Sequence, residues 1–98
     1  MTKVKIFISQ AMNGLTEEQI RERRARITEY LETQFDDFEI IKSILEPGEH
    51  PPLWYLGKSI EMLSEADLAV FDENWYKSRG CRIEFECCVQ YNVKMLFI

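Results

Sequence analysis

One acidic residue, Glu84, lies on the side of a predicted helix that otherwise carries apolar residues. The helix is expected over Ser78–Tyr91, and a helical wheel at about 100° per residue divides its residues between two sides. The inward side carries Cys81, Glu84, Phe85, Cys88 and Tyr91. A carboxylate that faces inward must find a partner, line a cleft or stay protonated. Because a carboxylate in a cleft is suited to nucleophilic attack on a sugar carbon, Glu84 is the first catalytic candidate.

The other side of the same helix is predicted to face solvent. It carries Arg79, Arg82, Glu86 and Gln90. Arg82 precedes Glu86 by about one helical turn, so these two side chains are expected to form an ordinary surface ion pair. Glu86 is therefore expected to have no chemical role.

The start of this helix is suited to binding an anion. Ser78 is a good N-cap, and Gly80 leaves the first turn without a side chain, so a ligand oxygen can approach the free backbone amides. A phosphate or sugar hydroxyl bound there would bring a sugar carbon near Glu84. Ordinary helix capping remains an equally open interpretation of Ser78 and Gly80.

Length and composition limit the possible partners. A chain of 98 residues suits one domain spanning residues 1–98. Its net charge of −5 disfavours binding to a nucleic-acid backbone. No apolar run approaches the roughly 20 residues that cross a bilayer, and the opening strand does not resemble a secretion signal. We therefore expect no nucleic-acid or membrane partner and a cytoplasmic location.

The cysteines suggest neither disulfides nor a metal site. The chain has 3 cysteines, at positions 81, 87 and 88, which in a cytoplasmic protein are expected to be reduced thiols. Together with the single histidine, His50, they form no recognisable zinc spacing, so no metal is expected. The adjacent Cys87 and Cys88 leave open a redox or interaction role.

Apolar periodicity and turn residues predict strands that alternate with helices. A capping-box pattern at Thr16–Gln19 starts the first helix, and a glycine- and proline-containing loop at 46–52 precedes the second. The buried stripes are Ile20, Ile27, Leu31 and Phe35 in the first helix and Leu53, Leu56, Ile60 and Leu63 in the second. The predicted strands are Val4–Ser9, Phe38–Ile41, Asp67–Phe71 and Val93–Ile98, and the helices span about 16–34, Leu53–Ser64 and Ser78–Tyr91.

This alternation predicts an α/β fold of the three-layer Rossmann or flavodoxin-like type. The sheet is expected to have four parallel strands in the order 2-1-3-4, with three helices distributed over both faces. Ligands bind such sheets at the carboxyl ends of the strands, near the switch point between the first and third strands. The loops Ser9–Leu15 and Asp72–Arg79 leave these two strands, so we expect them to form one crevice.

The segment Ser78–Glu84, preceded by the strand Ala66–Val70, resembles the nucleoside 2-deoxyribosyltransferase superfamily. The opening Ile6–Gly14 and the stretch Asn74–Gly80 support the resemblance, which extends over nearly the whole chain. Together they are most similar to a small bacterial and phage branch of that superfamily.

The resemblance implies a reaction at the N-glycosidic bond of a deoxynucleoside or its 5′-monophosphate. Glu84 would attack C1′ and form a covalent glycosyl-enzyme, which another base or water resolves, without a metal or organic cofactor. Ser78 matches the position of a phosphate-binding serine, which favours a nucleotide. Asp72 would contact the leaving base or assist proton transfer, unless it only accepts backbone amides at the start of its loop.

The resemblance also implies a set of binding residues and an oligomer. The expected substrate-binding residues are Ser9, Gln10, Met12, Asn13, Gly14, Asp67, Trp75, Ser78 and Gly80. In active relatives an aromatic residue orients the nucleophile, and the candidates here are Phe7, Tyr55 and Tyr76. Relatives complete a neighbour's pocket, so a homodimer or higher homo-oligomer is expected.

A second function fits the same residues. Gln10 and Ala11 occupy loop positions where relatives usually carry glycine and proline, so the backbone there approaches a ligand less closely. This departure favours a binding module for a nucleotide or nucleotide-sugar that keeps the crevice without the chemistry.

Overall fold

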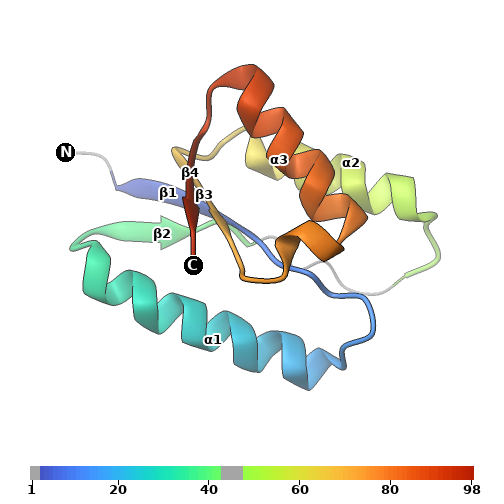
Figure 1. The fold of residues 1–98 in the computed structure, drawn as a ribbon, viewed down its shortest axis with the longest axis horizontal. Coiled ribbons are helices and arrows are strands. Elements are labelled where there is room, and N and C mark those ends of the chain that lie inside the picture. The colour runs from blue at the N-terminus through green and yellow to red at the C-terminus, as the bar shows by residue number, and fades with distance from the viewer. Residues whose placement is uncertain (1–2, 43–47) are drawn as a thin grey trace.

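Four parallel strands form one sheet in the order β2-β1-β3-β4 (Figure 1). A computed structural model of the protein describes residues 3–42 and 48–98, so the predicted loop at 46–52 lies partly outside the described residues. The strands are β1 (Val4–Ser9), β2 (Phe38–Ile40), β3 (Leu68–Phe71) and β4 (Lys94–Phe97), and the helices are α1 (Glu17–Gln34), α2 (Pro52–Leu63), the short 3-10 helix η1 (Trp75–Lys77) and α3 (Arg79–Tyr91). The predicted α/β fold and strand order are confirmed.

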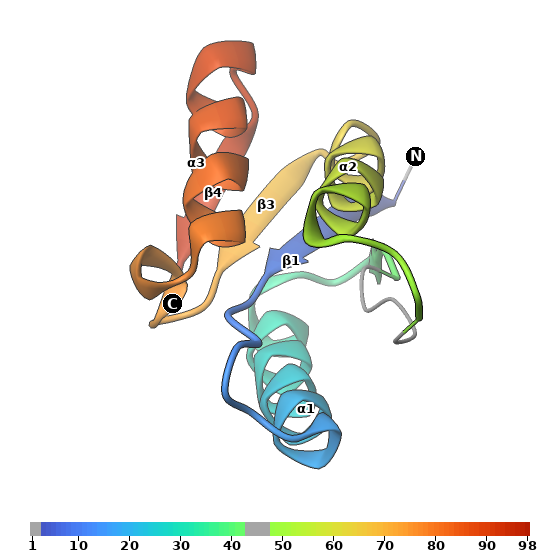
Figure 2. The ribbon, with the colours of Figure 1, turned by 90° about the vertical axis from the view of Figure 1, so that its right-hand side faces the viewer.

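The helices cover both faces of the sheet. Figure 2 shows α1 on one face and α2 and α3 on the other. β1 lies in the middle and pairs in parallel with both β2 and β3. Because the last residue of β1, Ser9, pairs with the last residue of β3, Phe71, the loops that leave these strands start side by side.

Two apolar layers form the core, one on each face of the sheet. The layer beneath α1 contains Ile6, Ile8, Ile27, Leu31 and Val70. The layer beneath α2 and α3 contains Phe7, Leu63, Ala69, Phe71 and Cys88. Alternate residues of β1 and β3 enter alternate layers, as a pleated strand requires, so residues 6–8 and Leu68–Phe71 carry apolar side chains on both faces of the sheet.

The capping box and the apolar stripe fix where α1 begins and how it faces. The Thr16 side chain accepts from the Gln19 amide, and the Gln19 side chain accepts from the Thr16 amide. Ile27 and Leu31 are fully buried against the sheet. Both features match the sequence prediction for this helix.

Two inward positions predicted at helix ends and one predicted ion pair are wrong. Leu53 is 76% exposed and Tyr91 is 81% exposed, because the wheel that assigned them inward does not show where a helix end extends past its neighbours. The expected Arg82–Glu86 ion pair is replaced by other contacts. Glu86 accepts from Gln90 at 2.9 Å, and Arg82 points to the Tyr76 carbonyl at 3.5 Å.

The packing of α1 can be tested by truncating its buried stripe. We expect Leu31→Ala to lower the free energy of unfolding by about 2–5 kcal/mol, because it removes apolar burial and leaves a cavity. Its exposed neighbour gives the control, since Glu32→Ala should change stability by less than about 0.5 kcal/mol. Urea denaturation measures both values, and equal effects would contradict the assigned face of α1.

Candidate functional site

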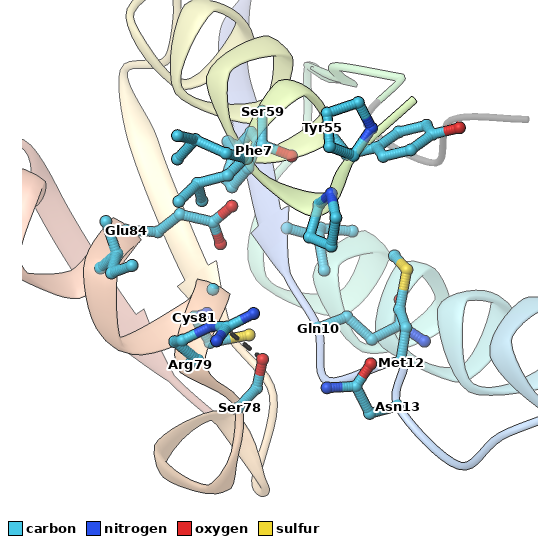
Figure 3. Close-up of a pocket in the computed structure, with 17 residues that line it drawn as sticks. Phe7, Gln10, Met12, Asn13, Tyr55, Ser59, Ser78, Arg79, Cys81 and Glu84 are labelled. Atoms are coloured by element: carbon cyan, nitrogen blue, oxygen red, sulfur yellow. Dashed lines mark hydrogen bonds between the residues drawn. The ribbon is translucent and has the colours of Figure 1, made fainter. Parts of the chain in front are cut away.

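A cleft of about 720 Å³ opens beside the carboxyl end of β1. Its walls come from three parts of the chain: the end of β1 with its loop, the first half of α2, and the start of α3 (Figure 3). The lining residues are Phe7, Ile8, Gln10, Met12, Asn13, Pro51, Pro52, Leu53, Tyr55, Leu56, Ser59, Ser78, Arg79, Gly80, Cys81, Ile83 and Glu84. The cleft therefore lies where the topology of the sheet predicts a ligand site.

Glu84 is the acidic residue of this cleft and is only 6% exposed. The Ser9 hydroxyl donates a buried hydrogen bond of 2.7 Å to its Oε1 atom. Among the described residues nothing donates to Oε2, and this atom is not sealed from solvent. One oxygen is thus held while the other remains available to a ligand.

Burial raises the pKa of Glu84 from 4.5 to about 6, and the hydrogen bond from Ser9 opposes this rise. The sign follows from desolvation, which penalises the charged form, whereas a donor to the carboxylate favours it. At pH 7 the group is mostly ionised but closer to neutrality than an exposed glutamate. That state is suited to a nucleophile or a general base.

The thiols near Glu84 are not activated. Burial raises the pKa of Cys81, which lines the cleft, and raises that of Cys88 to about 11. A neutral thiol is a poor nucleophile. The described cysteines are unpaired, and the predicted redox role of Cys87 and Cys88 gains no support from their surroundings.

The start of α3 forms the polar end of the cleft. The Ser78 hydroxyl accepts from the Cys81 amide at 3.3 Å, which confirms Ser78 as the N-cap. A Cβ at Gly80 would meet only atoms at 3.9 Å or more, so the fold does not require glycine there. The missing side chain instead leaves room for a ligand oxygen near the start of the helix, where the Cys81 amide is already bonded to Ser78.

Arg79 lines the cleft, although the helical wheel placed it outward. Figure 3 shows it beside Ser78, across the cleft from Gln10 and Asn13. The ion pairs formed by the described residues do not include Arg79. An anion entering the cleft would therefore meet a cation that is not held in one of these ion pairs.

Asp72 does not reach the cleft, contrary to its predicted catalytic role. It follows Phe71 in the strand alternation and therefore faces α1, where Arg23 Nε donates to its two carboxylate oxygens at 2.9 and 3.0 Å. Its Oδ1 also accepts from the Glu73 amide at 2.8 Å. Asp72 thus ties the loop after β3 to α1 and has the structural role considered as the alternative.

Gln10 lines the cleft but its amide group is held by α1. Its Nε2 donates to the Ile20 carbonyl at 2.9 Å, and its Oε1 accepts from Arg24 Nε at 2.9 Å. Burial lowers the pKa of Arg24 to about 10, although the nearby Asp72 charge opposes the change. Gln10 therefore fixes the first loop, with its amide atoms occupied by protein.

The remaining predicted residues divide between the cleft and other places. Met12 and Asn13 line the cleft. Gly14 lies outside the lining, and its φ of +81° explains why this turn carries glycine. Asp67 and Trp75 are not brought to the site by the described structure.

Asp67 and Trp75 lie away from the cleft because each has a structural role elsewhere. Asp67 precedes β3, at the opposite edge of the sheet, where it is exposed and accepts from the Lys5 amide at 2.9 Å. Trp75 stacks on Phe85 at 4.8 Å between ring centroids and contacts Phe71 at 5.5 Å. Its indole thus serves the apolar layer beneath α3.

The wall formed by α2 was missed by the sequence analysis. Tyr55 and Ser59 line the cleft beside Leu56. A serine such as Ser59 beside an apolar stripe gives no distinctive sequence signal. Its place in the cleft becomes visible only from the way α2 lies beside the cleft. Tyr55 is one of the predicted orienting residues, but Figure 3 shows its hydroxyl pointing away from Glu84.

Comparisons of the chain with models of known protein families, with curated proteins and with solved structures find no match. The family resemblance therefore stays a prediction. Within residues 3–42 and 48–98, no cluster of three or more histidine, cysteine and acidic side chains is placed to hold a metal ion. None of the helices described has the length and apolar character needed to cross a bilayer.

The raised pKa of Glu84 gives a pH-dependent stability. Folding favours the protonated form, so its contribution is fully present below pH 4.5 and is lost as the pH rises through about 6. Ionising the buried carboxyl lowers the free energy of unfolding by about 2 kcal/mol, since the pKa rises from 4.5 to about 6 and one pKa unit corresponds to about 1.4 kcal/mol. We expect Glu84→Gln, relative to the wild type, to gain about this much in unfolding free energy between pH 4 and pH 8.

Urea denaturation at several pH values measures this gain, and Glu86→Gln on the exposed side of α3 is the matched control. Its stability relative to the wild type should stay level over the same range. A level or falling curve for Glu84→Gln would mean that Glu84 is not held in a desolvating environment.

Proposed function

We propose that the protein cleaves or transfers at the N-glycosidic bond of a deoxynucleoside or its 5′-monophosphate, with Glu84 as the nucleophile. The observation that carries the proposal is the state of this carboxylate. Glu84 is only 6% exposed, and its Oε1 atom accepts a hydrogen bond from Ser9. Its Oε2 atom has no donor among the described residues and faces the cleft. Its pKa of about 6 leaves it ionised at neutral pH.

The proposed reaction has two steps. Glu84 Oε2 forms a bond to C1′ as the bond from C1′ to the base nitrogen breaks, and the electron pair leaves with the base, which takes a proton from water. Water or a second base then attacks C1′, the bond to Oε2 breaks, and the proton of the attacking group goes to solvent. A carboxylate suits both steps, because it stabilises an oxocarbenium-like transition state and then traps it.

The start of α3 supplies a second point of attachment. Arg79 and the amides of the first turn favour an anion such as a 5′-phosphate. Arg79 precedes Glu84 by five positions in α3, which corresponds to about 7.5 Å along the helix axis at 1.5 Å per residue. This is the length scale of one nucleoside monophosphate, so one ligand can engage both ends of the cleft.

One observation favours a second candidate, a nucleotide-binding module without chemistry. Among the described lining residues Glu84 is the only carboxylate, and Asp72, the expected proton donor, is bound to Arg23. Glycosidases usually employ a pair of carboxylates. A cleft with a single acid would still hold a nucleotide through α3 and the apolar wall of α2.

Base release separates the two candidates. We expect purified protein incubated with a panel of deoxynucleosides and deoxynucleoside monophosphates to release free base, measured by chromatography. Glu84→Gln should abolish release, because an amide cannot trap the sugar, while Glu86→Gln should retain it. Thermal stabilisation by ligand without base release, equal in the wild type and Glu84→Gln, would instead support the binding module.

The role of Arg79 predicts a preference for the phosphorylated ligand. We expect Arg79→Gln to weaken binding of the deoxynucleoside monophosphate by about 10-fold or more, since a hydrogen bond to a charged group contributes about 1.5–3 kcal/mol. Binding of the deoxynucleoside, which has no phosphate, should be nearly unchanged. Arg82→Gln, one turn further and outside the cleft lining, is the control. Titration calorimetry or KM values measure the effect, and equal loss for both ligands would contradict a phosphate contact.

A further inference from the structure

The residue that contacts the nucleophile is a serine from β1. Of the three aromatic candidates for an orienting residue, Phe7 has no hydroxyl, and Tyr76 is exposed. The Tyr55 hydroxyl has no hydrogen-bond partner among the described residues and points away from Glu84. Ser9 instead donates to Glu84 Oε1 at 2.7 Å, within the buried part of the molecule.

We infer that Ser9 is the positioning residue of Glu84: its hydroxyl holds Oε1 so that Oε2 is the oxygen presented to the substrate. This inference rests on the proposed function, since it assigns the orientation of the nucleophile in that reaction. It concerns a residue that the family resemblance placed among those that bind substrate. Ser9 is absent from the lining of the cleft, which separates it from Gln10 and Asn13 of the same segment.

Ser9 is held firmly enough to serve this purpose. It ends β1, pairs with Phe71 of β3, and its carbonyl accepts from the Asp72 amide at 3.0 Å. The whole residue is 1% exposed, so solvent does not compete for the hydroxyl. A donor fixed on a paired strand is more precise than one on a loop, and a glutamate with several rotatable bonds gains most from such a restraint.

The pleat of β1 explains why the donor is Ser9. Phe7 enters the apolar layer beneath α2 and α3, and side chains alternate along a strand, so Ser9 faces the same layer. Glu84 projects from α3 into this layer from the opposite side. The two side chains therefore meet where the sheet ends and the cleft begins.

The charged and titratable groups around Glu84 must be known before a pKa measured for its carboxyl can be assigned to Glu84 itself. On α3 these are the thiols Cys81 and Cys88, and Arg79 at the mouth of the cleft; α2 contributes the Tyr55 phenol. Asp72 lies on the α1 face with Arg23. Burial raises the pKa of both thiols, which moves their titration further from that of Glu84.

The test replaces Ser9 and follows the Glu84 carboxyl directly. We expect Ser9→Ala to raise the pKa of Glu84 by about one unit, because a hydrogen bond to the charged form is lost. The pKa is measured by carbon NMR titration of the side-chain carboxyl in the protein without substrate. Ser9→Thr, which keeps a hydroxyl, should restore the wild-type value, and Ser59→Ala, which removes a cleft hydroxyl not bonded to Glu84, should leave it unchanged.

Kinetics provide the second measurement. We expect Ser9→Ala to lower kcat by about 10- to 100-fold with little change in KM, since orientation of the nucleophile acts in the transition state, and to shift the acidic limb of the pH profile upward. Ser9→Thr should recover most of kcat.

The two measurements distinguish failure of the inference from failure of the proposed function. An unchanged pKa in Ser9→Ala, or an equal shift in Ser59→Ala, overturns the positioning role whether or not base is released. If Ser9→Ala shifts the pKa of Glu84 but the wild-type protein releases no base, the proposed reaction is overturned while the contact between Ser9 and Glu84 remains supported.

Discussion

The parallel pairing of β1 with β3 is the constraint on which the rest of the site depends. It places Ser9 beside Phe71 at one edge of the sheet, and the loops and helix that follow these residues form the cleft. Without this pairing the Ser9 hydroxyl and the Glu84 carboxylate, 75 positions apart, would not meet. The contact stabilises a charge that burial penalises, and a buried carboxylate retained at such a cost is typical of functional sites.

The sheet also keeps two sets of charges apart. Asp72 and Arg23 neutralise each other on the α1 face, whereas Glu84 lies on the opposite face with a hydroxyl as its only donor among the described residues. An arginine bonded to Glu84 would favour the ionised carboxylate and lower its pKa. Because both Arg23 and Arg24 act on the α1 side, Glu84 keeps a pKa of about 6 and an oxygen free for a ligand.

Local sequence patterns were sufficient for the fold and for part of the site. Periodicity, the Thr16 capping box and the Ser78 N-cap predicted the elements, and the inward position of Glu84 followed from the wheel. The partners of polar residues could not be predicted this way, since Arg23 reaches Asp72 across 49 positions. The position of Asp67, by contrast, follows from the sequence, because a residue just before a parallel strand lies at the amino ends of the strands, opposite the ligand site.

A single carboxylate restricts the leaving group that the proposed chemistry can accept. In an O-glycoside the departing oxygen develops charge that a second carboxylic acid normally neutralises. With Asp72 held on the other face by Arg23, the described lining of the cleft offers no such acid. A nucleobase spreads the departing electron pair over a conjugated ring and can take its proton from water. A cleft with one carboxylate is poorly suited to hydrolysing O-glycosides in general, but it is compatible with the proposed attack on an N-glycoside, in which Ser9 would orient Glu84.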